Sequence, residues 1–586
     1  MTEFSVWAPE RDRVRVQIGR TSHELRSTED GWWRVDVPGT GPGTDYAFLL
    51  DDSDEALPDP RSLWQPDGVH GPSRVYEHGA FEWTDSAWTG RALPGGVVYE
   101  LHIGTFTEGG TFDSAIERLD HLVELGVDFV EVLPVNAFDG VHGWGYDGVL
   151  WYAAHDPYGG PDGFKRFVDA CHARGLAVLL DVVYNHLGPS GAYLDRFGPY
   201  FAGQTIWGPT LNLDGPRSDE VRRYAIDNAV SWLRDFHVDG LRLDAVHALS
   251  DRRAIHLLEE LASEVDSLAA HLRRPLSLIA ESDLNDPRLI TPREAGGYGL
   301  HAQWSDDLHH CLHATLTGER QGYYGDFGSL PALAATLRSA FFHAGTWSSF
   351  RGRTHGRQVD TLTTSGHRFL AYLQNHDQIG NRATGDRLSA TLSPGLLACG
   401  AALVLCSPYT PMIFMGEEWA ARTPWQFFAS FPDPELAEAV RTGRGAEFAE
   451  HGWDAQDVPD PMDPDTVRRS RLDWSEQREP SNARTLAVYR ELIALRRAHP
   501  ELTDPRLDRL RVEFDESARW IVLHRGELRL ACNLGAQPAA LPLTGEVLFS
   551  SGPGVLAEED SLHVPAETAV LLRLRSGSGS GDAGRR

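Results

Sequence analysis

The chain is poor in cysteine and almost free of lysine. Its 586 residues include five cysteines, an odd number without CxxC spacing, so the sequence indicates neither a disulfide framework nor a thiolate zinc site. So few cysteines favour a reducing cytosol. Lys165 is the only lysine and lies beside Arg166 in a predicted amphipathic helix, which argues against a Schiff-base or pyridoxal mechanism.

Basic charge and long apolar runs are also scarce. The 54 lysine and arginine residues stand against 84 aspartate and glutamate residues, a formal charge of −30. Nucleic acids and anionic membranes attract basic surfaces, so a neutral or cationic ligand fits this chain better. The longest apolar run begins at Leu396 and is shorter than the roughly 20 residues of a membrane-spanning helix. The first residues contain no apolar core segment, so we expect no signal peptide and a soluble, cytoplasmic protein.

Three regions of different character follow one another along the chain. Residues 1–90 hold short alternating runs such as VRVQI, separated by Gly, Pro and Asp turns, which predict a β-sandwich. In residues 91–503, short apolar runs alternate with long amphipathic segments, the pattern of repeated βα units. Residues 504–574 return to short β-like runs and predict a second β-sandwich, and residues 575–586 have the composition of a disordered linker.

Eight apolar runs in the central region are strand candidates. They predict an α/β fold, a closed (β/α)8 TIM barrel flanked by the two sandwiches, although an open doubly wound sheet has the same alternation. The segment SDEVRRYAIDNAVSWLRDFH predicts a helix that Ser218 caps. The loop from Tyr184 to about Arg217 is long enough for a small excursion domain. The eight runs are VVYELHIGTF, FVEVLPV, AVLLDVV, GLRLDA, LSLIAES, HAQWS, RFLAYLQNHD and PMIFMG.

Four of these runs lead into charged or polar side chains. In a (β/α)8 barrel the active site lies at the carboxyl ends of the strands, so a polar residue that closes an apolar strand is a catalytic candidate. A single such residue is more often a strand-end charge or a helix cap, but four strands together indicate a catalytic mouth. The residues concerned are Asp181, Asn185 and His186; Arg242 and Asp244; Glu281; and His376 and Asp377.

Carboxylates that converge on one mouth suit the cleavage of an acetal. A retaining glycosidase uses an ionised carboxylate as nucleophile and a protonated one as acid, about 5 to 5.5 Å apart. Burial and the nearby negative charge would raise the pKa of the acid and leave the two groups in opposite protonation states. Arg242 lies two residues before Asp244 and so points the same way along the strand, where it would keep Asp244 ionised and oriented.

The runs DVVYNH, GLRLDAVH, AES and QNHD resemble, in this order, the four signature regions of the α-amylase family of glycoside hydrolases. The resemblance covers most of the central region. It implies that Asp244 is the nucleophile, Glu281 the general acid/base, and Asp377 the group that holds the sugar hydroxyls and stabilises the transition state. The family positions that bind the sugar at the cleavage point are matched by His186, Arg242, His376 and Tyr146.

Within the family, longer runs such as YELHIGTFT, NHDQIGNRA and GEEWAARTPWQFF resemble members that release trehalose from maltooligosyl-trehalose by cutting the adjoining α-1,4 bond. The resemblance implies maltooligosaccharides as further ligands, a functional pairing with maltooligosyltrehalose synthase, and an immunoglobulin-like N-terminal sandwich of the carbohydrate-binding-module type. A branching enzyme, which transfers the glycosyl unit to another glucan, is an alternative because water and sugar compete for the same intermediate. A glucan-binding protein without catalysis is a third possibility, but it would have no need of an acid/base pair.

Further substrate-binding candidates follow from position. Asp181 and His247 adjoin the predicted catalytic strands. Glu417 and Glu418 close the eighth strand, where they could reach the sugars beyond the cut; a helix cap or a solvated surface position fits them equally. The histidines of SDDLHHCLH are expected to line the cleft or lie on the surface, and not to bind zinc. Aromatic faces can serve as platforms for sugar rings, and the tryptophans at predicted loops or strand ends are Trp144, Trp207, Trp304, Trp419 and Trp425.

One departure from the family pattern concerns metal. Typical members follow the nucleophile with Ala, an aliphatic residue, Lys and His, and the backbone of that His helps to bind calcium. Here the order is Ala245, Val246, His247, Ala248. We therefore expect no required calcium and no cofactor. The run GWGYDG matches GxGxxG formally but lies in mid-loop instead of opening a helix, so no nucleotide site is expected.

Overall fold

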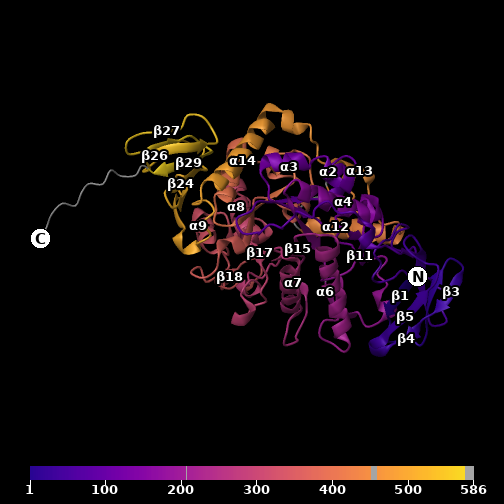
Figure 1. Cartoon of the computed structure of the whole chain (residues 1–586). Helices are drawn as coiled ribbons and strands as arrows, with labels where there is room; N and C mark the ends of the chain where they lie inside the picture. The colour runs from indigo at the N-terminus through magenta and orange to yellow at the C-terminus, as the bar shows by residue number, and fades with distance from the viewer. Residues whose placement is uncertain (206, 451–457, 575–586) are drawn as a thin grey trace.

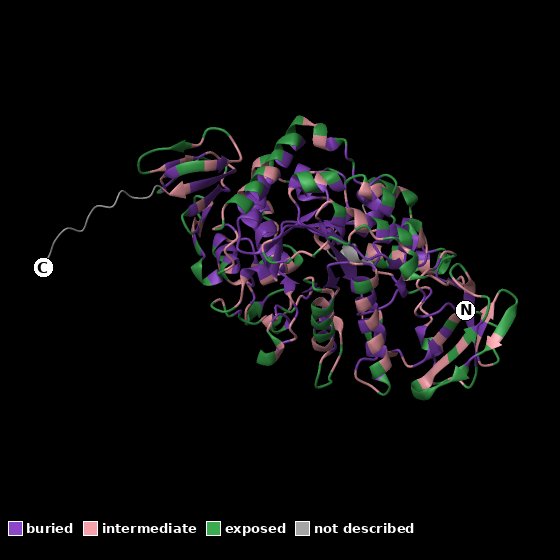
Figure 2. Cartoon of the chain, viewed as in Figure 1, coloured by how far each residue is buried: buried purple, intermediate pink, exposed green. Residues whose placement is uncertain are grey.

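The computed structural model describes residues 1–205, 207–450 and 458–574, the side chains of 446–450 excepted. The N-terminal strands and the C-terminal strands lie at opposite ends of the molecule, with a barrel between them (Figure 1). Buried residues concentrate in this central barrel (Figure 2). The tail predicted at 575–586 lies outside the described residues, and the predicted domain boundaries remain predictions.

Eight parallel strands close into the barrel, so the predicted (β/α)8 fold is confirmed and the open sheet is wrong. Each strand falls within one of the eight predicted runs or begins one residue before it. Around the barrel they are β12 (Ala177–Val182), β15 (Gly240–Leu243), β16 (Ser277–Ala280), β17 (Ala302–Trp304), β20 (Phe369–Tyr372), β21 (Thr410–Phe414), β8 (Val98–Leu101) and β9 (Phe129–Val132).

Every residue of these strands is buried, which explains why the sequence shows continuous apolar runs in place of alternation. One face of each strand packs under the surrounding helices, and the other fills the barrel interior. Apolar side chains such as Leu179, Ile279 and Met412 form one interior cluster. The charged residues that interrupt the runs are therefore held in place by a closed, packed scaffold.

Helices cover the outside of the barrel. Between β16 and β17 the chain makes two 3-10 turns, Pro287–Leu289 and Arg293–Ala295, in place of an α-helix. The longer helices are α4 (Gly160–Ala173), α6 (Ser218–Asp235), α7 (Leu257–Leu272), α8 (Asp306–Thr317), α9 (Leu330–Ser339), α11 (Pro394–Leu405), α12 (Pro434–Glu450) and α14 (Pro480–Ala498). None of the described helices is long and apolar enough to cross a membrane.

The start of α6 differs from the prediction. Ser218 is the first helical residue and not the cap; the capping position belongs to Arg217, whose backbone is left-handed and whose side chain makes no capping bond. The preceding loop does form a small excursion, with α5 (Leu194–Phe197) and a hairpin of β13 (Phe201–Thr205) and β14 (Gly208–Leu211).

Both ends of the chain form pairs of antiparallel sheets, as predicted. The N-terminal sheets have the orders β1-β5-β4 and β3-β2-β6-β7, and the C-terminal sheets β22-β23-β24-β29-β26 and β25-β28-β27. The N-terminal strands are β1 (Thr2–Trp7), β2 (Val14–Ile18), β3 (Thr21–Glu24), β4 (Arg26–Ser27), β5 (Trp32–Val37), β6 (Asp45–Leu50) and β7 (Ser73–Arg74). The C-terminal strands are β22 (Arg511–Asp515), β23 (Trp520–Arg525), β24 (Leu528–Asn533), β25 (Ala539–Leu541), β26 (Gly545–Ser550), β27 (Leu556–Ala557), β28 (Leu562–Val564) and β29 (Thr568–Leu574).

A buried histidine ties the segment before the barrel to the amino-terminal rim. His172, near the end of α4, bonds Asp85 through Nδ1 at 2.9 Å and Asp239 through Nε2 at 3.0 Å. Trp88 stacks on its ring with 4.5 Å between centroids. Burial disfavours the charged ring, but the hydrogen bonds to Asp239 and Asp85 outweigh burial and raise the pKa of His172. We expect this bridge to stabilise the fold as a cation between two carboxylates.

We predict that His172→Gln lowers the thermal midpoint of unfolding more at pH 6 than at pH 9. The folded-state pKa of His172 lies above its unfolded value, so the contribution is complete below about pH 6.5 and disappears as pH rises through the folded pKa. Removing one partner of a buried ion pair destabilises by about 3–5 kcal/mol. Differential scanning fluorimetry against the exposed control His271→Gln measures the effect, and an equal loss at both pH values would contradict it.

Candidate active site

One arginine organises the carboxyl-terminal rim of the barrel. Arg242, on β15, is fully buried, and its Nη1 donates to both oxygens of Asp181 at 2.9 Å and to Asp244 Oδ1 at 2.6 Å. Its Nη2 lies 3.6 Å from Glu281 Oε2. The pairing register places Asp181 on β12 directly beside Arg242, which explains the contacts between these two side chains. We call Asp181, Asp244 and Glu281 the carboxylate cluster.

The predicted nucleophile and the predicted acid come from neighbouring strands and flank the same guanidinium. Asp244 follows β15, and Glu281 follows β16. The backbone N–H of Ala245 also donates to Glu281 Oε2 in a short bond, and Ala245 has a left-handed φ of 39°. An alanine held in that conformation carries strain, and it aims the amide of the residue after Asp244 at the acid. The two carboxylates therefore share one rim.

The two carboxylates differ in environment. Burial raises the pKa of Glu281 well above its usual range, and the negative charges of Asp244, Asp377 and Asp306 add to this, against the opposing effect of Arg242. Glu281 is therefore suited to keep a proton at neutral pH. Asp244 instead accepts bonds from Arg242 and, at 2.6 Å, from Asn185 Nδ2, and both donors favour a charged acceptor.

Aromatic and imidazole rings lie next to the carboxylate cluster. The Tyr146 hydroxyl lies 2.6 Å from Asp181 Oδ2 and 2.8 Å from His376 Nε2, and the Tyr146 and His376 rings stack at 5.2 Å. Asp377 Oδ2 lies 3.4 Å from the same nitrogen, and the Asp377 side chain is 38% exposed. These contacts bring Tyr146, His376 and Asp377 to the same rim as the carboxylate cluster.

The remaining rim candidates lie at the edge of the site. His186 contacts Asn185, which binds Asp244, and stacks at 6.2 Å on Trp207. Trp207 is 45% exposed and is the one cleft tryptophan candidate with an open ring. His247 lies 6.1 Å from Trp207 and 3.8 Å from Asp283.

The structure does not bring every candidate to the mouth. Glu417 is buried, accepts a bond from the Tyr489 hydroxyl of α14 at 2.9 Å, and so faces the outer helices. Trp304 is buried inside the barrel, and the guanidinium carbon of Arg242 lies 4.4 Å from the centre of its ring. The tryptophans at 144, 419 and 425 are also buried, with Trp144 packed against His376 at 6.0 Å. A ring without an open face cannot carry a sugar, so these four remain packing residues in the structure.

Sequence reasoning missed two carboxylates near the site, the buried Glu100 and the partly buried Asp306. Glu100, on β8, bonds His376, and its place in the apolar run VVYELHIGTF is the signal that could have revealed it. Asp306 accepts a bond from the Tyr372 hydroxyl, and burial raises its pKa to about 7. Asp306 begins α8, so it resembled an ordinary helix-start carboxylate.

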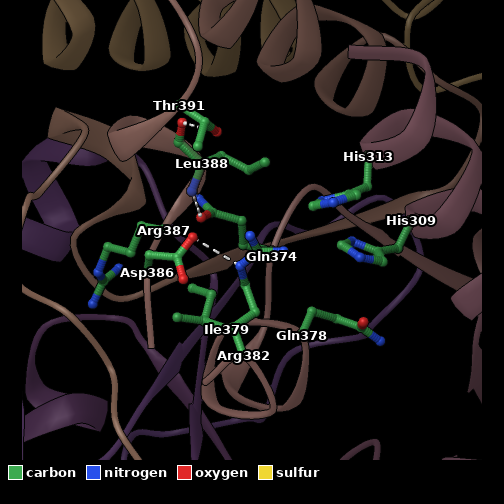
Figure 3. Close-up of a pocket in the computed structure, with 10 residues that line it drawn as sticks. All are labelled: His309, His313, Gln374, Gln378, Ile379, Arg382, Asp386, Arg387, Leu388 and Thr391. Carbon is green, nitrogen blue, oxygen red and sulfur yellow. Dashed lines mark hydrogen bonds and ion pairs between the residues drawn. The ribbon is translucent and has the colours of Figure 1, made fainter. Parts of the chain in front are cut away.

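A small cavity is lined in part by Gln378 and Ile379 of α10 (His376–Gly380), the helix that also holds Asp377 (Figure 3). It measures about 10 Å³, enough for about one water molecule. His309 and His313 line this cavity, and both are buried. The prediction that the histidines of SDDLHHCLH line the cleft or lie on the surface is therefore wrong for these two residues. Within the described residues, no group of three or more His, Cys, Asp or Glu side chains is arranged to hold a metal ion. That no calcium is required stays a prediction.

Comparisons with known proteins show which proteins this chain is similar to. The model of the alpha amylase catalytic domain matches residues 70–199, and that of a domain of unknown function, DUF3459, matches residues 505–572. The chain is 56% identical to a malto-oligosyltrehalose trehalohydrolase of Mycobacterium tuberculosis, over 98% of this chain and 99% of the relative. It is 57% identical to one of Arthrobacter ramosus, over 97% and 99%. A 1,4-alpha-glucan branching enzyme of Corynebacterium jeikeium is 30% identical over 52% and 48%.

Solved structures share the architecture. A Salmonella typhimurium protein assigned as an alpha amylase superposes with a TM-score of 0.90 at 38% identity, over 98% of this chain and 97% of the other. A pullulanase of Anoxybacillus, solved with maltotetraose, superposes with a TM-score of 0.73 at 18% identity, over 98% and 86%. At that lower identity the likeness concerns the fold alone.

We predict that Arg242→Met destabilises the fold by about 3–5 kcal/mol at pH 7, because it leaves buried carboxylates without their cation. The loss should be smaller at pH 5, where protonation removes part of their charge; the pKa of Asp181 is already raised to about 6. Chemical denaturation at the two pH values measures the difference. The surface variant Arg253→Met is the control, and a loss that grows on acidification would contradict the prediction.

Proposed function

The chain belongs to the malto-oligosyltrehalose trehalohydrolase family of the α-amylase group of glycoside hydrolases, and from this premise we propose how its barrel performs the reaction. The enzyme hydrolyses the α-1,4-glucosidic bond that joins the terminal trehalose to maltooligosyl-trehalose. The products are trehalose and a shorter maltooligosaccharide. The observation that carries the assignment of residues is the pair Asp244 and Glu281, which flank Arg242 in different electrostatic environments.

In the first step the Asp244 carboxylate attacks the anomeric carbon of the glucan next to trehalose. Glu281 gives its proton to the glycosidic oxygen as the bond breaks, and trehalose leaves with that proton as a hydroxyl. The raised pKa of Glu281 supports this role, because an acid must keep its proton until the leaving group needs it. Arg242 remains paired with Asp244 and stabilises its charge before attack.

In the second step water breaks the covalent glycosyl ester on Asp244. Glu281, now ionised, takes a proton from the water, whose oxygen bonds to the anomeric carbon and returns Asp244 to its carboxylate form. This double displacement retains the anomeric configuration. Asp377, Tyr146, His186 and His376 would hold the hydroxyls and ring of the sugar at the cleavage point, with Asp377 placed beside His376 Nε2 at 3.4 Å.

We also propose where the substrate comes from and in which compartment the enzyme acts. A maltooligosyltrehalose synthase would supply the substrate, because the bond between the two glucose units of trehalose must be formed before this enzyme acts. All five cysteines are buried free thiols, which supports a place in the reducing cytoplasm. We assign Asp181 the support of Arg242 and Tyr146. Trp144 and Glu417 are left outside the direct sugar contacts, because Trp144 stacks on Trp425 and Glu417 binds Tyr489 of α14.

We predict that Asp244→Asn and Glu281→Gln each lower kcat for trehalose release by about 1000-fold or more and leave the fold intact. Each change keeps the shape of the side chain and removes the charge or the titrating group. Initial rates on maltotriosyl-trehalose, with circular dichroism as the check on folding, measure the loss. Glu559→Gln, at an exposed position, is the control, and near-normal turnover in either active-site variant would refute the assigned roles.

We predict that the wild-type enzyme releases free trehalose from a trehalose-capped maltooligosaccharide and forms no α-1,6 bonds from linear maltooligosaccharide. Chromatography of the products and proton NMR of the anomeric signals separate the two outcomes. New branches with little free trehalose would instead identify a branching enzyme, and no product at all would identify a binding protein.

A further inference from the structure

Glu100 holds His376 at two points from inside the barrel. One carboxylate oxygen, Oε2, accepts the backbone N–H of His376 at 3.0 Å, and the other, Oε1, lies 2.6 Å from the ring nitrogen Nδ1. Both residues are 1% exposed. Glu100 lies on β8 and His376 follows β20, and β21 lies between these strands in the barrel. The carboxylate therefore reaches past a strand to reach the imidazole.

The hydrogens available along this chain of contacts constrain the protonation of the His376 ring, with Glu100 as a carboxylate. Arg242 Nη1 donates to both oxygens of Asp181, so Asp181 is the acceptor of the Tyr146 hydroxyl proton at 2.6 Å. Tyr146 has only one proton to give, so its oxygen accepts from His376 Nε2 at 2.8 Å. An ionised Glu100 carboxylate has no proton to give, so in that state it accepts from Nδ1. Both ring nitrogens of His376 thus carry hydrogen.

We propose that Glu100 is a positioning residue that holds His376 as an imidazolium, with its Nε2–H directed at Tyr146 and Asp377 on the rim of the proposed sugar site. The proposal rests on the proposed function, since it assigns His376 a role in that reaction. Glu100 lies beneath His376 and touches no substrate atom itself. The neighbouring charges also favour the imidazolium. Burial and the charge of Arg242 lower the pKa of His376, but Asp377 and Glu100 outweigh them and raise it to about 9.

A His376 ring that is charged at neutral pH differs from a neutral ring in its hydrogen bonding. A neutral ring could present a lone pair at Nε2, whereas the imidazolium only donates there, to Tyr146, Asp377 or a sugar hydroxyl. The donor stays fixed because Glu100 prevents the ring from turning about its side-chain bonds. A fixed donor that needs no rearrangement during the reaction favours the transition state.

Glu131 provides a matched control. It lies on β9 directly beside Glu100 in the strand register and is also 1% exposed. Its Oε2 is buried without a hydrogen-bond partner in the described part of the chain. Burial and the charge of Glu100 raise the pKa of Glu131 well above its usual range, so we expect Glu131 to keep its proton at neutral pH. Glu131→Gln replaces one neutral group by another, whereas Glu100→Gln removes a charge.

The kinetic test compares Glu100→Gln with Glu131→Gln on maltotriosyl-trehalose. An amide has one acceptor oxygen, so it cannot accept both His376 donors, and its NH2 group opposes one of them. We expect kcat of Glu100→Gln to fall about 10- to 100-fold, the effect typical of losing a partner that orients a functional histidine. KM should change less than kcat. Glu131→Gln should keep kcat within about twofold of the wild type.

A spectroscopic test needs no variant to be active. In wild-type enzyme labelled with ¹⁵N-histidine, the two ring nitrogens of His376 should resonate together as in an imidazolium at pH 7.5, with the signal assigned by its absence in His376→Asn. Glu100→Gln should split them as in a neutral ring. A neutral His376 in the wild type, or a Glu100→Gln enzyme with normal kcat, overturns the proposal.

The outcomes separate this proposal from the proposed function. If Glu100→Gln does not fold, the wild-type spectrum still decides the state of His376. If the wild type releases no trehalose, the proposed function fails while the imidazolium signal can still be present. If the wild type releases trehalose but its His376 is neutral, only the proposal on Glu100 fails.

Discussion

The site depends on the burial of one guanidinium. Arg242 has no exposed surface, so its charge must be met by carboxylates within the barrel, and Asp181, Asp244 and Glu281 meet it from three adjacent strands. The same contacts set the geometry of the chemistry, because two of these carboxylates are the proposed nucleophile and acid. Their positions are thus a consequence of satisfying a buried charge.

From Arg242 a chain of hydrogen bonds crosses the mouth of the barrel. It runs through Asp181 and Tyr146 to His376 and ends at Glu100 on the far side. With Glu100 as a carboxylate, each link pairs a donor with an acceptor, and this orders the hydrogens from Arg242 to the His376 ring. Below this polar layer the barrel interior holds an apolar cluster, and electrostatic interactions of buried polar groups are stronger in such a low-dielectric environment. The surface open to substrate is limited to its upper edge.

The position of a residue at a strand end predicts its direction when the strand itself orients the side chain, but not when a turn intervenes. Arg242 lies within β15, and Asp244 and Glu281 follow their strands directly, so all three face the mouth. Glu417 follows β21 too, but a glycine with φ of 84° at 416 and a 3-10 turn swing it outward to Tyr489. The prediction that Trp419 and Trp425 offer open faces to sugar rings was wrong for another reason. A residue in a loop can still be covered by its neighbours, and both of these side chains are buried.

The sequence by itself determined the barrel, its eight strands and the charged residues that interrupt them, because a strand buried on both faces leaves a continuous apolar run in which any charge is conspicuous. Only the tertiary structure decided which charges meet. The link between Glu100 and His376 joins residues 276 positions apart, and the protonation of Glu281 follows from burial among carboxylates of other strands. Such pairings arise when the sheet closes, and no local pattern encodes them.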